Sequence, residues 1–212
     1  MAATAVFVDF DGTITDVDTV DALVRAAVSD AFWEELDVDL DAGRITLREA
    51  FERQAAAMHW TRAETLAWVE RNARVDPTFG PFVAAVRASG ASICVVSSGI
   101  ASVIRDALAR AGVAVDVFAN DVDFSPAGWT IAFIDDSANA HDKAAHVRAA
   151  RAAGARTVYI GDGISDFEAA LAADERFAKA GRSLERYCRE RGAACTSFTS
   201  FDQIEARLFP AR

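Results

Sequence analysis

The sequence has no long apolar run. No segment approaches 18 consecutive uncharged apolar residues, and the apolar residues near the N-terminus stop at Asp9 and follow no basic region. A transmembrane helix needs about 20 predominantly apolar residues, and a signal peptide needs a basic segment before its apolar core. We therefore predict no membrane-spanning helix, no signal peptide and no membrane partner, and we expect the protein to be cytoplasmic.

Cysteine and histidine are scarce, with 3 residues of each type. Cys94, Cys188 and Cys195 form no C-x-x-C motif, and an odd number of cysteines cannot all pair within one chain. The histidines show no H-x-x-x-H spacing. These absences exclude a disulfide scaffold and argue against a zinc site, so any bound metal should be a hard cation held by oxygen atoms.

Positive charge is in deficit. The chain has 22 lysine and arginine residues against 32 aspartate and glutamate residues, for a net charge of -10. General binders of nucleic acids and of anionic membranes need a positive surface field, so this balance argues against both partners. An anionic small molecule would have to be held by local cations.

An acidic pair follows a short apolar strand near the N-terminus. Residues 5–8 have the pattern of a strand buried on both faces, Asp9 and Asp11 come after it, and Gly12 marks a turn. Ligands in open α/β sheets bind just outside the carboxyl ends of strands, so both aspartates are candidate catalytic residues. The alternatives are a plain acidic turn and a calcium loop, but that loop needs its glycine two positions later. The acidic segment 37–43 comes closer to a calcium loop, but Gly43 stands at position seven and Arg48 at position twelve, so we predict a solvated loop there.

The next part of the chain has helical patterns and no strand pattern. Thr46 and Thr61 each begin a capping box, in which glutamate follows three residues later. A chain of this length can hold a core with a smaller insert, so we expect residues 15–75 to form a small inserted α-helical cap domain. The predicted helices cover 17–28, 31–36, 47–58 and 63–74.

Strand and helix patterns alternate through the remainder of the chain. This alternation predicts an α/β fold with a doubly wound parallel sheet, built from residues 1–14 and 76–212 as the core domain. We also predict a hairpin over 122–134 that lies beside the site. The predicted strands are 91–96, 114–118, 156–160 and 176–180, and the predicted helices are 82–89, 101–110, 141–153, 184–191 and 201–209.

A second candidate site segment joins a predicted strand to a predicted helix. Ser97, Ser98 and Gly99 follow the strand over 91–96, and free backbone N–H groups at the start of a helix favour an anion. For this motif alone, an ordinary strand-to-helix turn is an equally good interpretation. Lys143 opens a later helix, and considered alone it would be a solvated helix start.

A second acidic strand end contains Asp162 and Asp166. Ser165 and Glu168 fit a capping box, which places Asp166 in the first turn of a helix, close to the loop with Asp162. The carboxyl ends of parallel strands meet at one edge of a sheet, so these carboxylates should meet the first acidic pair and Lys143 there. Clustered carboxylates raise one another's pKa values unless cations intervene, so we expect a divalent metal, and Mg²⁺ fits best.

In combination, these motifs resemble the haloacid dehalogenase superfamily, in its phosphoserine-phosphatase-like branch. The resemblance spans nearly the whole chain and rests on D-F-D-G-T at 9–13, the strand ending in Ser97, Lys143 before a helix, and G-D-G-x-x-D at 161–166. Each motif is weak alone, but four in this order are specific. Dehalogenases of the family lack the second aspartate of the first motif, so Asp11 implies a phosphatase.

The resemblance implies a magnesium-dependent phosphatase that hydrolyses a small phosphorylated metabolite through an aspartyl-phosphate intermediate. Asp9 would be the nucleophile, and Asp11 would act as general acid and then as general base. The resemblance also implies metal binding by Asp9, Asp11 (through its backbone carbonyl), Asp162 and Asp166, and phosphate binding by Ser97, Ser98, Gly99 and Lys143.

Within the predicted cap, the resemblance places Asp18, Arg53 and Gln54 near the leaving group. Asp18 stands where phosphoserine phosphatases carry the acidic residue that meets the substrate amine. Gln54 aligns with their arginine for the substrate carboxylate, and Arg53 is beside it. Asp18, Arg53 and the segment Y-I-G-D-G-I-S-D-F-E-A-A are also similar to the methionine-salvage phosphatases that act on an enol phosphate. Phosphoserine and the methionine-salvage substrate, 2-hydroxy-3-keto-5-methylthiopentenyl-1-phosphate, are therefore alternative substrates. A phosphomutase and a non-catalytic binding protein are the alternatives outside this class.

Overall fold

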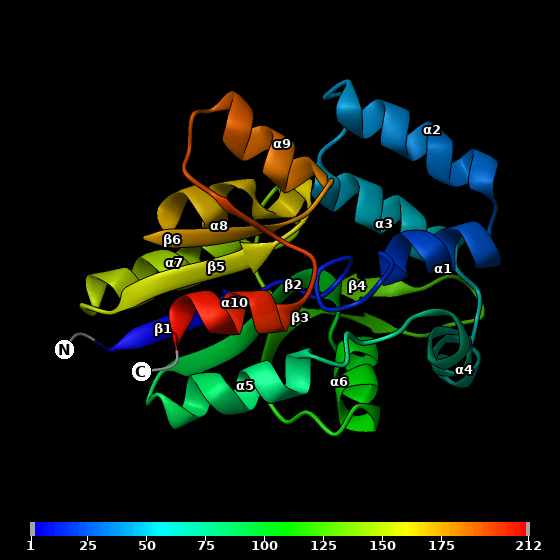
Figure 1. The fold of residues 1–212 in the computed structure, drawn as a ribbon. Coiled ribbons are helices and arrows are strands. Elements are labelled where there is room, and N and C mark those ends of the chain that lie inside the picture. The colour runs from blue at the N-terminus through cyan, green and yellow to red at the C-terminus, as the bar shows by residue number, and fades with distance from the viewer. Residues whose placement is uncertain (1–2, 211–212) are drawn as a thin grey trace.

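The computed structural model describes residues 3–210, and one sheet runs through the middle of the molecule (Figure 1). Across the sheet, the strand order is β4-β3-β2-β1-β5-β6-β7. Neighbouring strands are parallel, except that β4 is antiparallel to β3. The strands are β1 (Thr4–Val8), β2 (Ser92–Ile100), β3 (Asp116–Asp123), β4 (Thr130–Ala132), β5 (Arg156–Gly161), β6 (Glu175–Lys179) and β7 (Thr196–Phe198).

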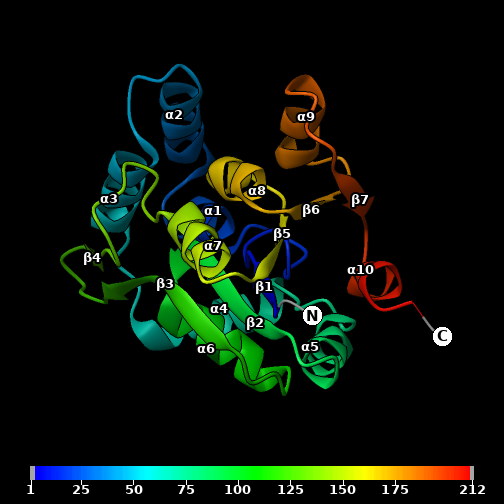
Figure 2. The same cartoon turned by 90° about the vertical axis from the view of Figure 1, so that its left-hand side faces the viewer.

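Helices cover both faces of the sheet (Figure 2). Alternate residues of β1 enter two cores, because Val6 and Val8 point to one face and Ala5 and Phe7 to the other. No helix within residues 3–210 has the length and apolar character needed to cross a membrane. This doubly wound arrangement confirms the predicted α/β fold class. The first face carries α5 (Phe79–Ala88), α6 (Ala101–Arg110) and α10 (Phe201–Leu208), and the second carries α7 (Lys143–Ala152), α8 (Phe167–Ala172) and α9 (Ser183–Glu190).

Four helices follow β1 in the sequence and form a helical segment beside the sheet (Figure 1). Thr46 and Thr61 make both predicted capping boxes. The prediction of a solvated loop over 37–43 is wrong, because the second helix continues to Asp41. Leu36 and Leu40 are four residues apart and both pack in one apolar cluster, which favours the helix. The helices are α1 (Thr19–Ala27), α2 (Asp30–Asp41), α3 (Leu47–Ala57) and α4 (Arg62–Asn72).

The chain enters and leaves the helical segment through a narrow neck, residues 14–16 and 74–76. Thr15 and Val75 form an antiparallel bridge. The backbone N–H of Asp16 donates to the carbonyl of Arg74 at 3.1 Å, and that of Asp76 donates to the carbonyl of Ile14 at 2.8 Å. The two crossings are therefore held side by side.

The hairpin of β3 and β4 packs against the helical segment. The backbone N–H of Trp129 donates to the carbonyl of Ala55 at 2.9 Å, and its indole N–H donates to the carbonyl of Trp60 at 2.7 Å. Gly128 has a φ of 119°, and a Cβ atom there would lie 2.6 Å from the carbonyl oxygen of Ala56. The hairpin thus supplies further hydrogen-bond donors to the Ala55 carbonyl, which also accepts from the N–H of Met58 at the end of α3, and to the Trp60 carbonyl just after the helix.

Candidate active site

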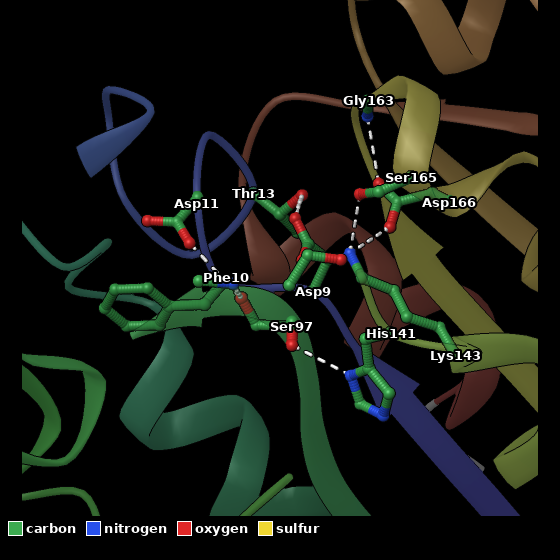
Figure 3. Close-up of polar contacts among 12 residues, drawn as sticks. Asp9, Phe10, Asp11, Thr13, Ser97, His141, Lys143, Gly163, Ser165 and Asp166 are labelled. Atoms are coloured by element: carbon green, nitrogen blue, oxygen red, sulfur yellow. Dashed lines mark hydrogen bonds and ion pairs between the residues drawn. The ribbon is translucent and has the colours of Figure 1, made fainter. Parts of the chain in front are cut away.

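Lys143 is the first residue of α7, and its side chain is buried at the carboxyl edge of the sheet (Figure 3). Its ammonium donates to Asp9 Oδ1 at 2.6 Å, to Asp166 Oδ1 at 2.8 Å and to Ser165 Oγ at 2.8 Å. Burial opposes the charge, but the carboxylates of Asp166 and Asp9 outweigh it and raise the pKa of Lys143. The side chain is therefore a charged partner of two carboxylates and not a solvated helix start.

Asp166 is saturated with hydrogen bonds. One carboxylate oxygen accepts from Lys143 and from the Tyr159 hydroxyl at 2.6 Å, and the other accepts from the backbone N–H groups of Asp162 and Gly163, both at 2.9 Å. The predicted capping box of Ser165 is wrong, because Asp166 ends a short 3₁₀ turn and stands at the N-cap of α8. The carboxylate of Asp166 itself organises this loop.

Asp9, Asp162 and Asp166 form an acidic cluster whose nearest ligand atoms all lie within 4.8 Å of one another. Burial, followed by the charge of Asp166, raises the pKa of Asp9 well above its ordinary value, even though Lys143 is adjacent. The same two causes raise the pKa of Asp162 to about 7. Thr13 bridges the pair, since its hydroxyl lies 3.3 Å from Asp9 Oδ2 and 3.2 Å from Asp162 Oδ1. Such a cluster is under-neutralised and can hold a cation.

Asp11 lies outside this cluster, and its side chain has different partners. One oxygen accepts hydrogen bonds from the hydroxyl and backbone N–H of Thr19, and the other accepts from Ser97 Oγ at 3.2 Å. Burial raises the pKa of Asp11, while these hydrogen bonds act in the opposite direction. A carboxyl group of this kind can hold and return a proton.

Ser97, Ser98 and Gly99 lie within β2, which continues to Ile100 and does not end at Val96 as predicted. The pairing with β3 is irregular between Val96 and Ile100, so the strand bends there. Ser97 Oγ accepts from the Gly99 N–H at 2.9 Å. A Cβ atom at Gly99 would lie 2.2 Å from Asp11 Oδ2, so glycine is needed here for the close approach of Asp11.

A histidine pair behind this segment, His141 buried and His146 half-buried, was not anticipated from the sequence. His141 Nδ1 lies 2.8 Å from the carbonyl oxygen of Ser97, and His141 Nε2 lies 3.0 Å from Nε2 of His146. Burial lowers the pKa of both histidines. The neutral pair supports the backbone that carries Ser97. The one sequence signal for a role of His141 was its position just before Asp142 and Lys143.

A cleft with a volume of about 170 Å³ opens above these residues. Its floor is formed by core residues that include Asp9, Asp11, Ser97, Ser98, Gly99, Lys143 and Asp162. Its roof comes from α1, α2 and α3, and the hairpin residues 122–134 contribute nothing to the described lining. The hairpin was expected to lie beside the site, but it instead contacts α3 and the residues that follow α3.

Two of the three predicted leaving-group residues line the cleft. Asp18 and Gln54 are lining residues, whereas Arg53 is not. The Arg53 side chain is 53% exposed, and its guanidinium lies 3.9 Å from Asp39. The sequence reasoning missed Asp21 and Asp37, which line the cleft from α1 and α2.

Four aspartates and a buried lysine meet at the carboxyl edge of the sheet beneath a cleft, which is the arrangement expected of an enzyme's active site. A family model described as haloacid dehalogenase-like hydrolase matches residues 6–171. The chain belongs to this family, as its motifs indicated, and it is a hydrolase.

Curated proteins of similar sequence cover nearly the whole chain. Pdp3-interacting factor 1 of Schizosaccharomyces pombe is 31% identical, over 96% of this chain and 93% of that protein. Polyol phosphate phosphatase PYP1 of Saccharomyces cerevisiae is 28% identical, over 98% and 93% respectively. A 2-hydroxy-3-keto-5-methylthiopentenyl-1-phosphate phosphatase of Geobacillus kaustophilus is 29% identical, over 94% and 93%.

Phosphoserine phosphatases are among the solved structures of similar fold. One from T. onnurineus, in complex with NDSB-201, has a TM-score of 0.74 and 19% identity, and the match covers 100% of this chain and 96% of that chain. At this level of identity, the likeness shows the shared fold.

Proposed function

We propose that this protein is a magnesium-dependent phosphatase that hydrolyses a small phosphate monoester through an aspartyl-phosphate intermediate. The supporting observation is the different surroundings of two neighbouring aspartates. Asp9 lies 2.6 Å from the ammonium of Lys143, whereas Asp11 is held by Thr19 and Ser97. The first environment suits a nucleophilic carboxylate, and the second suits a group that transfers a proton.

The acidic cluster fits Mg²⁺ by its charge and by its donor atoms. When all three carboxylates are ionised, the single ammonium leaves an excess of two negative charges, and the raised pKa values of Asp9 and Asp162 reflect this excess. Oxygen ligands suit a hard divalent cation. We assign Asp9, Asp162 and the backbone carbonyl of Asp11 to the metal, and we assign Asp166, whose oxygens already accept four hydrogen bonds, to orienting the loop. When bound, Mg²⁺ would neutralise charge on the phosphoryl group.

In the first step, a carboxylate oxygen of Asp9 would attack phosphorus as the bond to the leaving oxygen breaks. Asp11 would give its proton to that oxygen. Ser97, Ser98 and Lys143 would bind the other phosphoryl oxygens. The Gly99 N–H already donates to Ser97 Oγ, so we assign Gly99 to making room for Asp11.

In the second step, a water molecule would attack the phosphorus of the aspartyl phosphate. Asp11, now ionised, would take a proton from this water, and the bond between phosphorus and Asp9 would break. Inorganic phosphate would leave, Asp9 would be a carboxylate again, and Asp11 would be protonated for the next cycle. In both steps, the hydrogen bond from Ser97 would hold the Asp11 side chain beside the phosphoryl group.

The names of the relatives support a small phosphorylated metabolite as the substrate, since one is a polyol phosphate phosphatase and another a methionine-salvage phosphatase. We further propose that residues 15–75 act as a cap that encloses the leaving group, because α1, α2 and α3 form the roof of the cleft. A phosphomutase would use the same covalent step but would return the phosphoryl group to substrate.

Phosphate release from 4-nitrophenyl phosphate, with and without Mg²⁺, tests this proposal. The wild-type protein should release phosphate with Mg²⁺ and lose this activity after chelation. Asp9→Asn should lose activity by at least roughly 10,000-fold, because it removes the covalent nucleophile, and it should keep the wild-type circular dichroism spectrum. Retention of a tenth of the activity would exclude Asp9 as nucleophile, and transfer to an acceptor without net phosphate release would indicate a mutase.

A further inference from the structure

Gln54 is a buried polar residue with unused hydrogen-bonding groups. It lies on α3, is 9% exposed, and lines the cleft. Among residues 3–210, we find no hydrogen-bond partner for its carboxamide. Its nitrogen and oxygen are not among the enclosed, unpartnered side-chain atoms of the described residues, so they are open to the cleft and available to a ligand there.

The roof of the cleft around Gln54 is acidic. Asp18, Asp21 and Asp37 line it, and Lys143 is the one cation among the described lining residues. The ammonium of Lys143 lies at the floor, bonded to two carboxylates and a hydroxyl, where the proposed mechanism uses it for the phosphoryl group and not for the leaving group. Arg25 stacks on Trp33 at 3.7 Å and pairs with Asp30 at 2.8 Å, but it does not line the cleft. A leaving group therefore meets carboxylates, a neutral amide and apolar side chains such as Trp33, Leu36 and Phe51 at the roof.

The acidic residues of the roof influence one another. Burial, together with the charges of Asp11 and Asp37, raises the pKa of Asp21, while hydrogen bonding from Trp33 acts in the opposite direction. Asp21 and Asp37 therefore face the same space from two different helices, α1 and α2. A further negative charge placed between them would be repelled, whereas hydroxyl and ammonium groups would find acceptors.

We propose that Gln54, Asp21 and Asp37 select a leaving group that carries hydrogen-bond donors, hydroxyl or ammonium, and that they reject one that carries a carboxylate. This inference rests on the proposed phosphatase function and specifies its substrate class. A polyol or an amino alcohol has this chemistry. Phosphoserine does not, because Lys143 at the floor is the one cation among the described lining residues and none of them places a cation at the roof for its carboxylate.

Two matched pairs of substrates isolate the carboxylate. Glycerol 3-phosphate and 3-phosphoglycerate share a three-carbon skeleton, and they differ in a terminal hydroxymethyl or carboxylate group. O-Phosphoethanolamine and O-phosphoserine likewise differ by a carboxylate. The carboxylate-free member of each pair should have the higher kcat/KM by roughly tenfold or more, since like charges at a binding site are strongly disfavoured. The better of the two carboxylate-free substrates identifies the hydroxyl or the ammonium as the preferred donor.

Variants of the roof residues should change this ratio. Gln54→Arg introduces a cation and should raise kcat/KM for the carboxylate-bearing members relative to their partners by roughly tenfold. Asp37→Asn removes one negative charge and should change the ratio in the same direction. Glu34→Gln, on the same helix as Asp37 but outside the cleft lining, should leave the ratio at its wild-type value.

Activity on 4-nitrophenyl phosphate separates a failure of this inference from a failure of the proposed function. If the wild-type protein hydrolyses the aryl phosphate but prefers the carboxylate-bearing members, the inference is overturned and the phosphatase function stands. If neither Gln54→Arg nor Asp37→Asn changes the ratio, the roof residues do not select the leaving group. If the aryl phosphate is not hydrolysed, the proposed function itself fails.

Discussion

Asp11 is fixed by two distant parts of the chain. Thr19, the first residue of α1, binds one of its oxygens, and Ser97 in β2 binds the other. The side chain is buried, with an exposed fraction of 9%. In the proposed mechanism, this carboxyl group transfers a proton in both half-reactions. The first half-reaction depends on it less when the leaving group is good, whereas the second always needs it as a base.

Asp11→Asn should separate the two half-reactions when 4-nitrophenyl phosphate is the substrate. Nitrophenolate is a good leaving group that needs little protonation, so the aspartyl phosphate should still form. Its hydrolysis should be slow, because no base activates the water. Rapid-mixing measurements should show a burst of about one nitrophenolate per protein molecule, followed by slow turnover. Slow release without a burst would contradict the assignment of Asp11 to the second step.

Gly99→Ala should impair catalysis through a single atom. The new Cβ would lie 2.2 Å from Asp11 Oδ2, so the Asp11 side chain must move. A displacement of about 1 Å in a reacting group can reduce the rate about 100-fold, and we expect a kcat loss of that order with a smaller change in KM. Gly80→Ala, in helix α5, is the control, since its Cβ would make an ordinary 3.4 Å contact with Val113. Equal activity of the two variants would refute the role given to Gly99.

At the scale of helices and strands, elements with local signals were predicted well and elements shaped by distant contacts were not. The capping boxes at Thr46 and Thr61 are local, and α3 and α4 begin there. The acidic residues between 37 and 43 suggested a loop, but packing of Leu40 extends α2. The Ser-Ser-Gly segment suggested a turn, whereas pairing at Ile100 keeps it in β2.

The contact between the hairpin and α3 should depend on Gly128. In Gly128→Ala, the Cβ would lie 2.6 Å from the Ala56 carbonyl oxygen, and the backbone has a positive φ of 119°. The clash and the strained backbone together should lower the free energy of unfolding by about 2 kcal/mol. Hydrogen exchange should increase in α3 and α4 more than in β1 and β5.

Gly154→Ala provides the matched control for this prediction. Its φ is +85°, but nothing lies within 4 Å of the added Cβ. It should therefore show only the cost of the backbone conformation, about 1 kcal/mol, and no local increase in the exchange of α3. If both variants had the same exchange pattern, the hairpin would not be holding the helical segment.

At the scale of the whole molecule, the catalytic floor was predictable and the roof was not. Asp9, Asp11, Lys143 and Asp162 each follow or precede a recognisable element, and the parallel sheet brings them to one edge. Thr19, Asp21 and Asp37 have no local signal, because their places depend on how α1 and α2 pack over that edge. Arg53 carries the positive charge that an anionic group would need, unlike Gln54, but on α3 its side chain points to solvent and does not line the cleft.

The stability of the metal-free protein should fall as pH rises. Burial and the charge of Asp166 raise the pKa of Asp162 from 3.8 to about 7. The folded state therefore binds this proton more firmly than the unfolded state, so the contribution is complete at low pH and is lost as pH rises through 7. Melting temperatures in a chelator should decrease between about pH 4 and pH 7 because of this group.

Mg²⁺ should reverse this loss of stability. A cation that binds only the folded state raises the melting temperature by mass action, and its charge favours the ionised form of Asp162. Asp162→Asn should have a flatter pH dependence in the chelator and a smaller response to Mg²⁺. A wild-type melting temperature that is unaffected by Mg²⁺ at pH 8 would contradict the metal assignment.

Because of the neck, the roof and the floor of the active site can change independently during evolution. Because both crossings lie together at the Thr15–Val75 bridge, the helical segment is connected to the sheet as a loop with adjoining ends. Substitutions or insertions within that loop can reshape the roof while Asp9, Lys143 and Asp166 keep their mutual distances. Selection can therefore act on substrate preference as a heritable trait that varies independently of the phosphoryl-transfer chemistry.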